Sequence, residues 1–189
     1  MTRRRKSQYP VAPHGWGVFL RSRIESHTKA SILASELLLD LSEIDLTETR
    51  ISSDEIGKYI PQEGDMRQLD RIVWVSDAKT TCVAVKKVRD NEFWVPGHLP
   101  GRPLLPGVMM IEAAGQSSSV LYRVKTGLDQ FIGFIRCDDA VFRAQVVPGD
   151  TLYIISKEIE FKRRRFITLN QGILNNKLVF EAKITGMLM

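Results

Sequence analysis

The chain has 189 residues, 43% of them hydrophobic and 26% charged, so it is long enough to bury a core without disulfides or metals. No apolar run approaches the roughly 20 residues that a membrane-spanning helix needs, and two cysteines without a CxxC pair argue against a disulfide scaffold or a cysteine-rich zinc site. The formal net charge of +5 is concentrated in residues 1–30, where seven basic residues accompany one acid. The remaining chain therefore carries a net charge of −1, which is unlike a basic fold built to bind nucleic acid.

Residues 1–50 are expected to form a basic, partly disordered N-terminal extension. Such an arm fits a solvated tail, a contact with an anionic surface or a targeting segment, but the absence of an apolar run after its first basic residues argues against a secretory signal. Within the extension, residues 31–46 follow Ser31, a suitable N-cap, and carry apolar residues at helical spacing from Ile32 to Ile44. This segment is either an amphipathic helix docked on the body or a partly ordered arm.

Residues 51–189 carry the pattern of the main folded domain. A short helix is expected to begin at Ser53 and to end before Pro61. The pattern then changes to β-branched and apolar runs, which predict strands over 72–75 and 82–88 with a turn between them.

A loop rich in Gly and Pro follows at 96–107, before a long apolar segment. The length of this segment favours a helix over 108–125. Pro106 lies where proline is tolerated at a helix start, and Gly127 suits a C-terminal cap.

Strand patterns fill the rest of the chain, at 131–135, 140–147, 152–155, 165–174 and 177–188. Asn175-Asn176 between the last two is a hairpin-type turn. The last run alternates apolar and polar residues, which indicates a strand with one buried face. The arrangement that best accommodates these elements is an α+β fold, in which one antiparallel sheet curls around the long helix.

Glu112 lies among apolar residues of the predicted helix. A carboxyl group is costly to bury and is rarely kept in such a place without a partner. Burial would favour its protonated form, which could act as an acid near neutral pH. Gln116 lies four residues later on the same helix face, within hydrogen-bonding reach.

His98 and Gly107 flank the predicted start of this helix. Four prolines stiffen the loop around His98, so an imidazole there could be held in a defined position and act as a base. Gly107 lies where backbone N–H groups are unpaired, and one of them could stabilise an oxyanion. A base, an acid and an oxyanion donor suit removal of a proton α to a carbonyl with loss of a β-hydroxyl.

The motif GHLPGRPLLPGV at 97–108, followed by Glu112 and Gln116, resembles the (3R)-3-hydroxyacyl-[acyl carrier protein] dehydratases of the FabZ type. The resemblance runs from about Ile56 to the C-terminus, and the fourteen-residue separation of His98 and Glu112 matches the family. The related FabA branch has Asp at the position of Glu112. The resemblance implies a hotdog fold, in which a sheet wraps around a central helix.

The resemblance also implies a division of roles. His98 would remove the α-proton, and Glu112 of a partner subunit would protonate the departing hydroxyl. A homodimer would then be the minimum active unit, with a trimer of dimers as the usual assembly. The substrate would be carried on the phosphopantetheine of acyl carrier protein, and no metal or other cofactor is implied.

Four further residues are expected at the substrate site. The Gly107 N–H would bind the thioester carbonyl, Gln116 would hold the acid, the Leu104 carbonyl would orient the histidine ring, and Val108 would line the site. The family commonly has Phe where this chain has Leu99, and a different segment before the strand near residue 134, which affects the expected tunnel shape.

Other interpretations remain open at this point. A hotdog acyl thioesterase, a dehydratase-isomerase, and a non-catalytic hotdog scaffold with an anion-binding arm share the same fold. Glu rather than Asp at position 112 favours the plain dehydratase over the isomerase. The basic run 162–165 is either a docking patch for acidic carrier protein or a solvated hairpin end. We expect a cytoplasmic protein, because its cysteine usage suits a reducing compartment. We also expect no nucleic-acid binding, because the chain outside the basic arm is nearly neutral.

Overall fold

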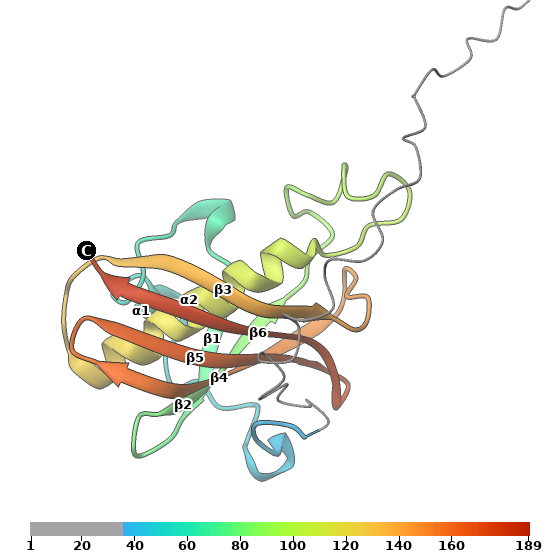
Figure 1. Cartoon of the computed structure of the whole chain (residues 1–189). Coiled ribbons are helices and arrows are strands. Elements are labelled where there is room, and N and C mark those ends of the chain that lie inside the picture. The colour runs from blue at the N-terminus through green and yellow to red at the C-terminus, as the bar shows by residue number, and fades with distance from the viewer. Residues whose placement is uncertain (1–35) are drawn as a thin grey trace, which may run out of the picture. The chain divides into compact units, whose positions relative to one another are not determined.

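The computed structural model describes residues 36–189, and a compact unit runs from Leu37 to Met189. A six-stranded sheet in the order β1-β2-β4-β5-β6-β3, with every neighbouring pair antiparallel, curls around one long helix, α2 (Figure 1). The predicted α+β architecture is confirmed. The elements are the 3-10 helices η1 (Leu41–Glu43) and η2 (Gly64–Met66), the helices α1 (Ser53–Ile56) and α2 (Gly107–Thr126), and the strands β1 (Arg71–Val75), β2 (Thr81–Lys87), β3 (Ile132–Phe142), β4 (Thr151–Lys162), β5 (Arg165–Leu174) and β6 (Lys177–Leu188).

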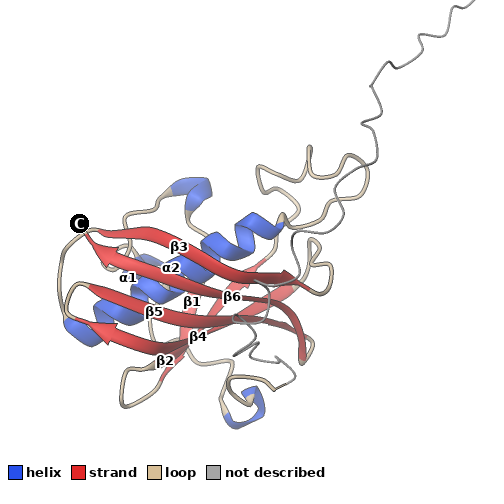
Figure 2. Ribbon diagram, viewed as in Figure 1, coloured by secondary structure: helices blue, strands red, loops and turns tan. Residues whose placement is uncertain are grey.

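Helix α2 is the centre of the core (Figure 2). It begins after Pro106 and ends at Gly127, whose left-handed conformation (φ 66°) lets its N–H reach the Arg123 carbonyl. Both boundary signals were visible in the sequence, and the helix prediction is confirmed. None of the helices among residues 36–189 is long and apolar enough to cross a membrane.

The short helix and the last hairpin are also confirmed. Ser52 caps α1 and exchanges hydrogen bonds with Glu55, which is a capping box. The helix ends at Gly57, before the predicted limit at Pro61. Asn175 and Asn176 both have positive φ (50° and 60°), as a two-residue turn that matches the strand twist requires.

Strand β3 differs from the prediction of two strands at 131–135 and 140–147. One strand runs continuously over Ile132–Phe142 and pairs with β6. The charged residues between the two predicted strands are accommodated by register shifts, and Asp139 has a positive φ of 52° there. A bulge inserts an unpaired residue without ending a strand. The polar residues that suggested a turn therefore belong to the hydrogen-bonded β3–β6 pair.

Residues 37–46 also depart from the helix considered for 31–46. The described part contains only the turn η1, and the rest of 31–46 lies outside the described residues. Leu41 packs with Val83 and Ile155 in a second apolar cluster. Alternate residues of the same strands pack against α2, so this segment covers the opposite face of the sheet. This segment is part of the compact unit that begins at Leu37.

Candidate active site

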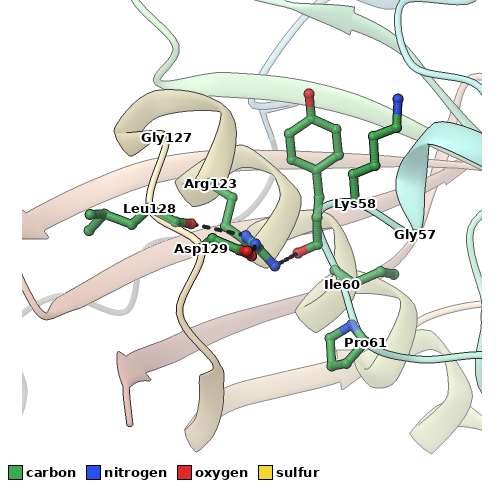
Figure 3. Close-up of a pocket in the computed structure, with 9 residues that line it drawn as sticks. Gly57, Lys58, Ile60, Pro61, Arg123, Gly127, Leu128 and Asp129 are labelled. Atoms are coloured by element: carbon green, nitrogen blue, oxygen red, sulfur yellow. Dashed lines mark hydrogen bonds and ion pairs between the residues drawn. The ribbon is translucent and has the colours of Figure 1, made fainter.

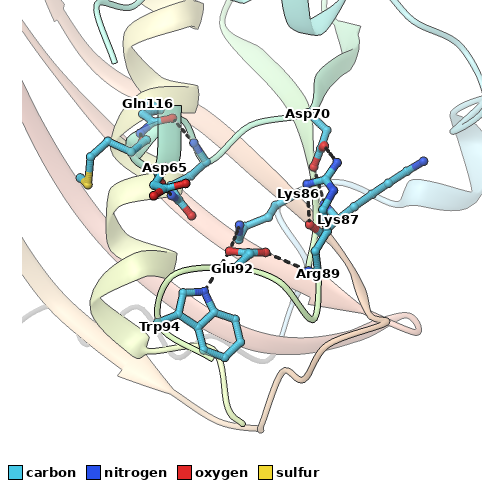
Figure 4. A network of polar contacts seen from close by, with 10 residues as sticks. Asp65, Asp70, Lys86, Lys87, Arg89, Glu92, Trp94 and Gln116 are labelled. Atoms are coloured by element: carbon cyan, nitrogen blue, oxygen red, sulfur yellow. Dashed lines mark hydrogen bonds and ion pairs between the residues drawn. The ribbon is translucent and has the colours of Figure 1, made fainter. Parts of the chain in front are cut away.

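The loop between β2 and α2 carries His98 and is anchored at its base by a buried ion pair. Lys86 on β2, 3% exposed, donates to the Glu92 carboxylate over 2.9 Å. The same carboxylate accepts the Trp94 indole N–H and the Arg89 backbone N–H, each at 2.9 Å (Figure 4). Burial alone would raise the pKa of Glu92, but these hydrogen bonds and the charge of Lys86 outweigh it, so its pKa lies below the usual value.

Trp94 connects this anchor to the histidine. Its carbonyl accepts the backbone N–H groups of Gly97 (3.1 Å) and His98 (2.8 Å). The His98 carbonyl in turn accepts the Leu104 N–H over 2.9 Å. The loop is therefore held at both sides of the histidine by backbone hydrogen bonds.

The His98 ring is oriented by the Leu104 carbonyl, a contact that the family resemblance implied. Nδ1 of His98 lies 2.9 Å from this oxygen. A carbonyl oxygen only accepts, so Nδ1 carries the proton in this contact. The neutral ring then has its lone pair on Nε2, and His98 is exposed on the isolated protomer. Such a nitrogen can accept a proton from a bound substrate.

Glu112 lies on α2 and is half-buried. Its Oε1 accepts the side-chain amides of Gln116 (2.8 Å) and Gln62 (3.2 Å). Among residues 36–189, no hydrogen bond involves Oε2 of this carboxyl group. The predicted contact with Gln116 is present, and Gln62 is a second partner that sequence reasoning missed. Gln62 lies 50 residues away in the chain, in a loop, and no spacing pattern relates the two.

Gln116 is itself fixed by the backbone of the loop that contains η2. Its Nε2 donates to the Met66 carbonyl over 2.6 Å, and its Oε1 accepts the Gln68 N–H over 2.9 Å (Figure 4). Gln116 is 1% exposed. The amide therefore has one possible orientation, with the nitrogen directed at Glu112.

Gly107 begins α2, so its N–H has no carbonyl partner within the helix. A Cβ atom there would lie 2.7 Å from the Phe142 ring, so a side chain at this position would require that ring to move. Val108 beside it is 68% exposed in the isolated protomer. The structure thus places His98, Leu104, Gly107 and Val108 together at the N-terminal end of α2, and Glu112 and Gln116 further along the helix. No hydrogen bond within residues 36–189 joins His98 to Glu112.

A separate pocket of about 570 Å³ lies at the other end of α2 (Figure 3). Its arginine, Arg123, donates to the carbonyls of Tyr59 and Leu128 (both 3.1 Å) and pairs with Asp129. These contacts tie the helix end to neighbouring loops. The pocket contains none of the predicted site residues.

The basic run 162–165 lies at that same helix end, because the Tyr122 hydroxyl donates to the Arg163 carbonyl over 2.6 Å. Lys162 and Arg165 both pair with Glu160. Two of the four basic residues in this run are therefore engaged within their own hairpin, and the run is distant within the protomer from the end that carries His98.

Comparison with known proteins identifies the family of this chain. A family model described as "FabA-like domain" matches residues 60–183. This chain belongs to the FabA-like family. Curated relatives named 3-hydroxyacyl-[acyl-carrier-protein] dehydratase FabZ include those of Lawsonia intracellularis, 32% identical over 70% of this chain and 88% of that protein, and Xanthomonas campestris, 32% identical over 74% and 86%. The relative from Protochlamydia amoebophila is 28% identical over 69% and 85%.

Solved structures share the fold at lower identity. The dehydratase heterocomplex ApeI:P from Xenorhabdus doucetiae superposes with a TM-score of 0.61 at 16% identity, over 71% of this chain and 90% of that chain. Cj0977, a sigma28-regulated virulence protein from Campylobacter jejuni, gives 0.54 at 12% identity, over 74% and 93%. At these identities the likeness establishes the fold alone, and it confirms the hotdog prediction.

Proposed function

We propose that this protein dehydrates (3R)-3-hydroxyacyl groups on acyl carrier protein to trans-2-enoyl groups, in fatty-acid or lipid biosynthesis. Two observations support the proposal: a histidine ring oriented by a backbone carbonyl, and a carboxyl group whose Oε2 has no hydrogen bond among residues 36–189 while its Oε1 accepts two. Relatives named for this reaction cover more than two thirds of the chain and contribute the substrate class.

The first step would be proton removal at the α-carbon. With Nδ1–H held by the Leu104 carbonyl, His98 would accept the proton at Nε2. The electron pair released from the C–H bond would move toward the thioester carbonyl, whose oxygen gains negative charge. The Gly107 N–H, at the start of α2, would donate a hydrogen bond to that oxygen, and exposed Val108 would contact the acyl chain.

The second step would be loss of the hydroxyl. Glu112 would give its proton to the 3-hydroxyl oxygen as the carbon–oxygen bond breaks, so that water leaves and the α,β double bond forms. His98 has then gained one proton and Glu112 has lost one, so the charges balance. Transfer of a proton from His98 back to Glu112 restores both groups for the next turnover. Nothing is oxidised or reduced, so the step needs no cofactor.

The two catalytic groups would come from different protomers. Strand β3 is at the edge of the sheet, and large apolar side chains on or beside it are exposed, namely those of Phe131, Phe134, Ile135, Val141 and Phe142. A long apolar edge strand is normally paired or covered. Pairing of two β3 strands around a two-fold axis would cover both edges and create a homodimer, which could assemble further into a hexamer.

Acyl carrier protein remains the proposed partner, without an assigned docking patch. Cytoplasmic location is part of the same proposal, and it is supported by two free cysteines, Cys82 and Cys137.

The test is turnover of 3-hydroxyacyl thioesters of graded chain length, with products identified by mass spectrometry. We expect trans-2-enoyl thioester from the full-length protein, and loss of turnover by at least about 100-fold in His98→Ala and Glu112→Gln. Free acid as the product would instead indicate a thioesterase, and a cis-3-enoyl product an isomerase. Near-normal turnover by either variant would contradict the assigned roles.

A further inference from the structure

The Glu112 carboxyl group is asymmetrically bound, which has a consequence for the reaction. Both amide donors, from Gln62 and Gln116, reach Oε1. An oxygen that already accepts two hydrogen bonds has less affinity for a proton than one that accepts none. The protonated acid would therefore carry its hydrogen on Oε2.

We propose that Gln62 is a positioning residue that, together with Gln116, holds Oε1 of Glu112 so that the transferable proton is on Oε2. This inference rests on the proposed dehydration and deepens it, because it says which oxygen serves the departing hydroxyl and what selects that oxygen. Gln62 itself would not contact the reacting atoms.

The orientation of Gln62 supports a role beyond packing. While its Nε2 donates to Glu112, its Oε1 is buried and has no hydrogen-bond partner in the described part of the chain. Buried polar atoms are nearly always satisfied, and exceptions concentrate where function requires them. Turning the amide would present its oxygen to a carboxylate oxygen, which is repulsive. The unsatisfied acceptor is thus the consequence of directing the donor at the acid.

The backbone around Gln62 is also held in place. Arg67 Nε donates to the Gln62 carbonyl over 3.0 Å, and the same loop binds Gln116 through Met66 and Gln68. One short segment therefore positions both amides. A fixed donor loses little entropy when it orients another group.

No charged side chain forms an ion pair with Glu112 among residues 36–189. On the segment packed against it, Glu63 and Asp65 are exposed, and Arg67 is directed at backbone carbonyls. On β3, Arg136 pairs with Asp138. In the proposed dimer, the partner's His98 would be the titratable group facing the carboxyl.

The experiment compares Gln62→Leu and Gln62→Glu with Gln130→Leu, a control that makes the same type of change at an exposed amide. Each protein is assayed for kcat and KM on a short 3-hydroxyacyl thioester across pH, and for thermal stability. Gln62→Glu keeps the size of the side chain, so it carries the test if the leucine variant folds poorly.

We expect kcat to fall by about 10- to 100-fold in Gln62→Leu, the range that a lost hydrogen bond to an ionisable group allows, with KM within about twofold. The alkaline limb of the kcat profile, where the acid loses its proton, should move to higher pH, because the ionised carboxyl has lost a donor. Gln62→Glu should move it further, since two carboxyl groups then share one site. Gln130→Leu should match the unchanged protein.

Unchanged kcat and an unmoved alkaline limb in both Gln62 variants would overturn the inference, as would a kcat loss explained by a matching fall in thermal stability. The proposed function fails separately, if Glu112→Gln itself retains normal turnover. If Glu112→Gln is inactive while both Gln62 variants are fully active, the positioning role of Gln62 is wrong and the proposed function stands.

Discussion

The polar side chains in the two halves of α2 differ in how completely they are hydrogen-bonded. In the first half, up to Gln116, the Glu112 carboxyl is half-buried and keeps Oε2 without a partner among residues 36–189. In the second half, the Ser117 and Ser118 hydroxyls are fully buried and fully engaged. Within two turns, the same helix therefore carries a carboxyl group with one oxygen lacking a hydrogen bond among residues 36–189, and two serine hydroxyls whose hydrogen bonds are made.

The network joins the helix to the sheet. The hydroxyls of Ser156 on β4 and Ser117 lie within hydrogen-bonding distance (2.8 Å), and Asn170 on β5 accepts from Ser156 (2.7 Å) and Ser118 (2.9 Å). Cys82 lies 3.4 Å from the Ser117 hydroxyl, and burial raises the pKa of its thiol to about 11. A thiol with that pKa is protonated at neutral pH and chemically inert.

The polar groups of α2 therefore have two roles, one structural and one catalytic. Polar groups that satisfy one another away from water fix the packing of the helix on the sheet. A polar group with an unused oxygen, held by donors on its other oxygen, is available to a substrate. Changes in the first half should therefore affect turnover, and changes in the second half should affect stability.

The largest expected effect is that of Gln116→Leu. This variant loses the donor to Glu112 and the contacts with Met66 and Gln68, so kcat should fall by about 100-fold and the melting temperature should also drop. The control is Ser119→Ala, one turn further along, which should change kcat little. Turnover of Gln116→Leu near that of the control would contradict the distinction between the halves.

Asn170→Leu should produce the opposite result. Its loss leaves buried hydroxyls on α2 and β4 short of a partner, and we expect the free energy of unfolding to fall by about 3 kcal/mol in urea titrations. The exposed change Gln130→Leu should cost less than about 0.5 kcal/mol. The kcat of the folded Asn170→Leu protein should remain normal, and a selective loss of kcat without destabilisation would show that the second half takes part in the chemistry.

A smaller effect is expected for Glu92→Gln, and it depends on pH. Because the pKa of Glu92 is lower in the folded protein than its usual 4.5, its ionised form contributes stability above that pH, and the contribution is lost as pH falls through the folded-state value. Urea titrations at pH 7 and below 4.5 should show a weaker acid dependence in Glu92→Gln than in Asp90→Asn, and equal dependence would contradict this.

The sequence predicted elements whose signals are local. Pro106 and Gly127 bracket the long helix, and the two adjacent asparagines at 175–176 determine a turn that needs positive φ. The contact between Glu112 and Gln116 was predictable because helical geometry brings residues four apart together.

Features that depend on distant partners were not predictable. The Gln62 contact joins a loop to a helix across 50 residues. The packing of residues 37–46 on the outer face of the sheet depends on apolar side chains that alternate along other strands. Strand β3 continues through its charged centre because it pairs with β6 on both sides of the two register shifts.

The most direct test of the central claim uses two inactive variants together. His98→Ala and Glu112→Gln chains are co-expressed with different affinity tags, and dimers that contain one chain of each kind are isolated and assayed. If each site takes its histidine from one protomer and its carboxyl from the other, one of the two sites in a mixed dimer is intact, and about half of the normal turnover should return. If both groups acted within one protomer, the mixed dimers would stay as inactive as either parent, and the account would be wrong.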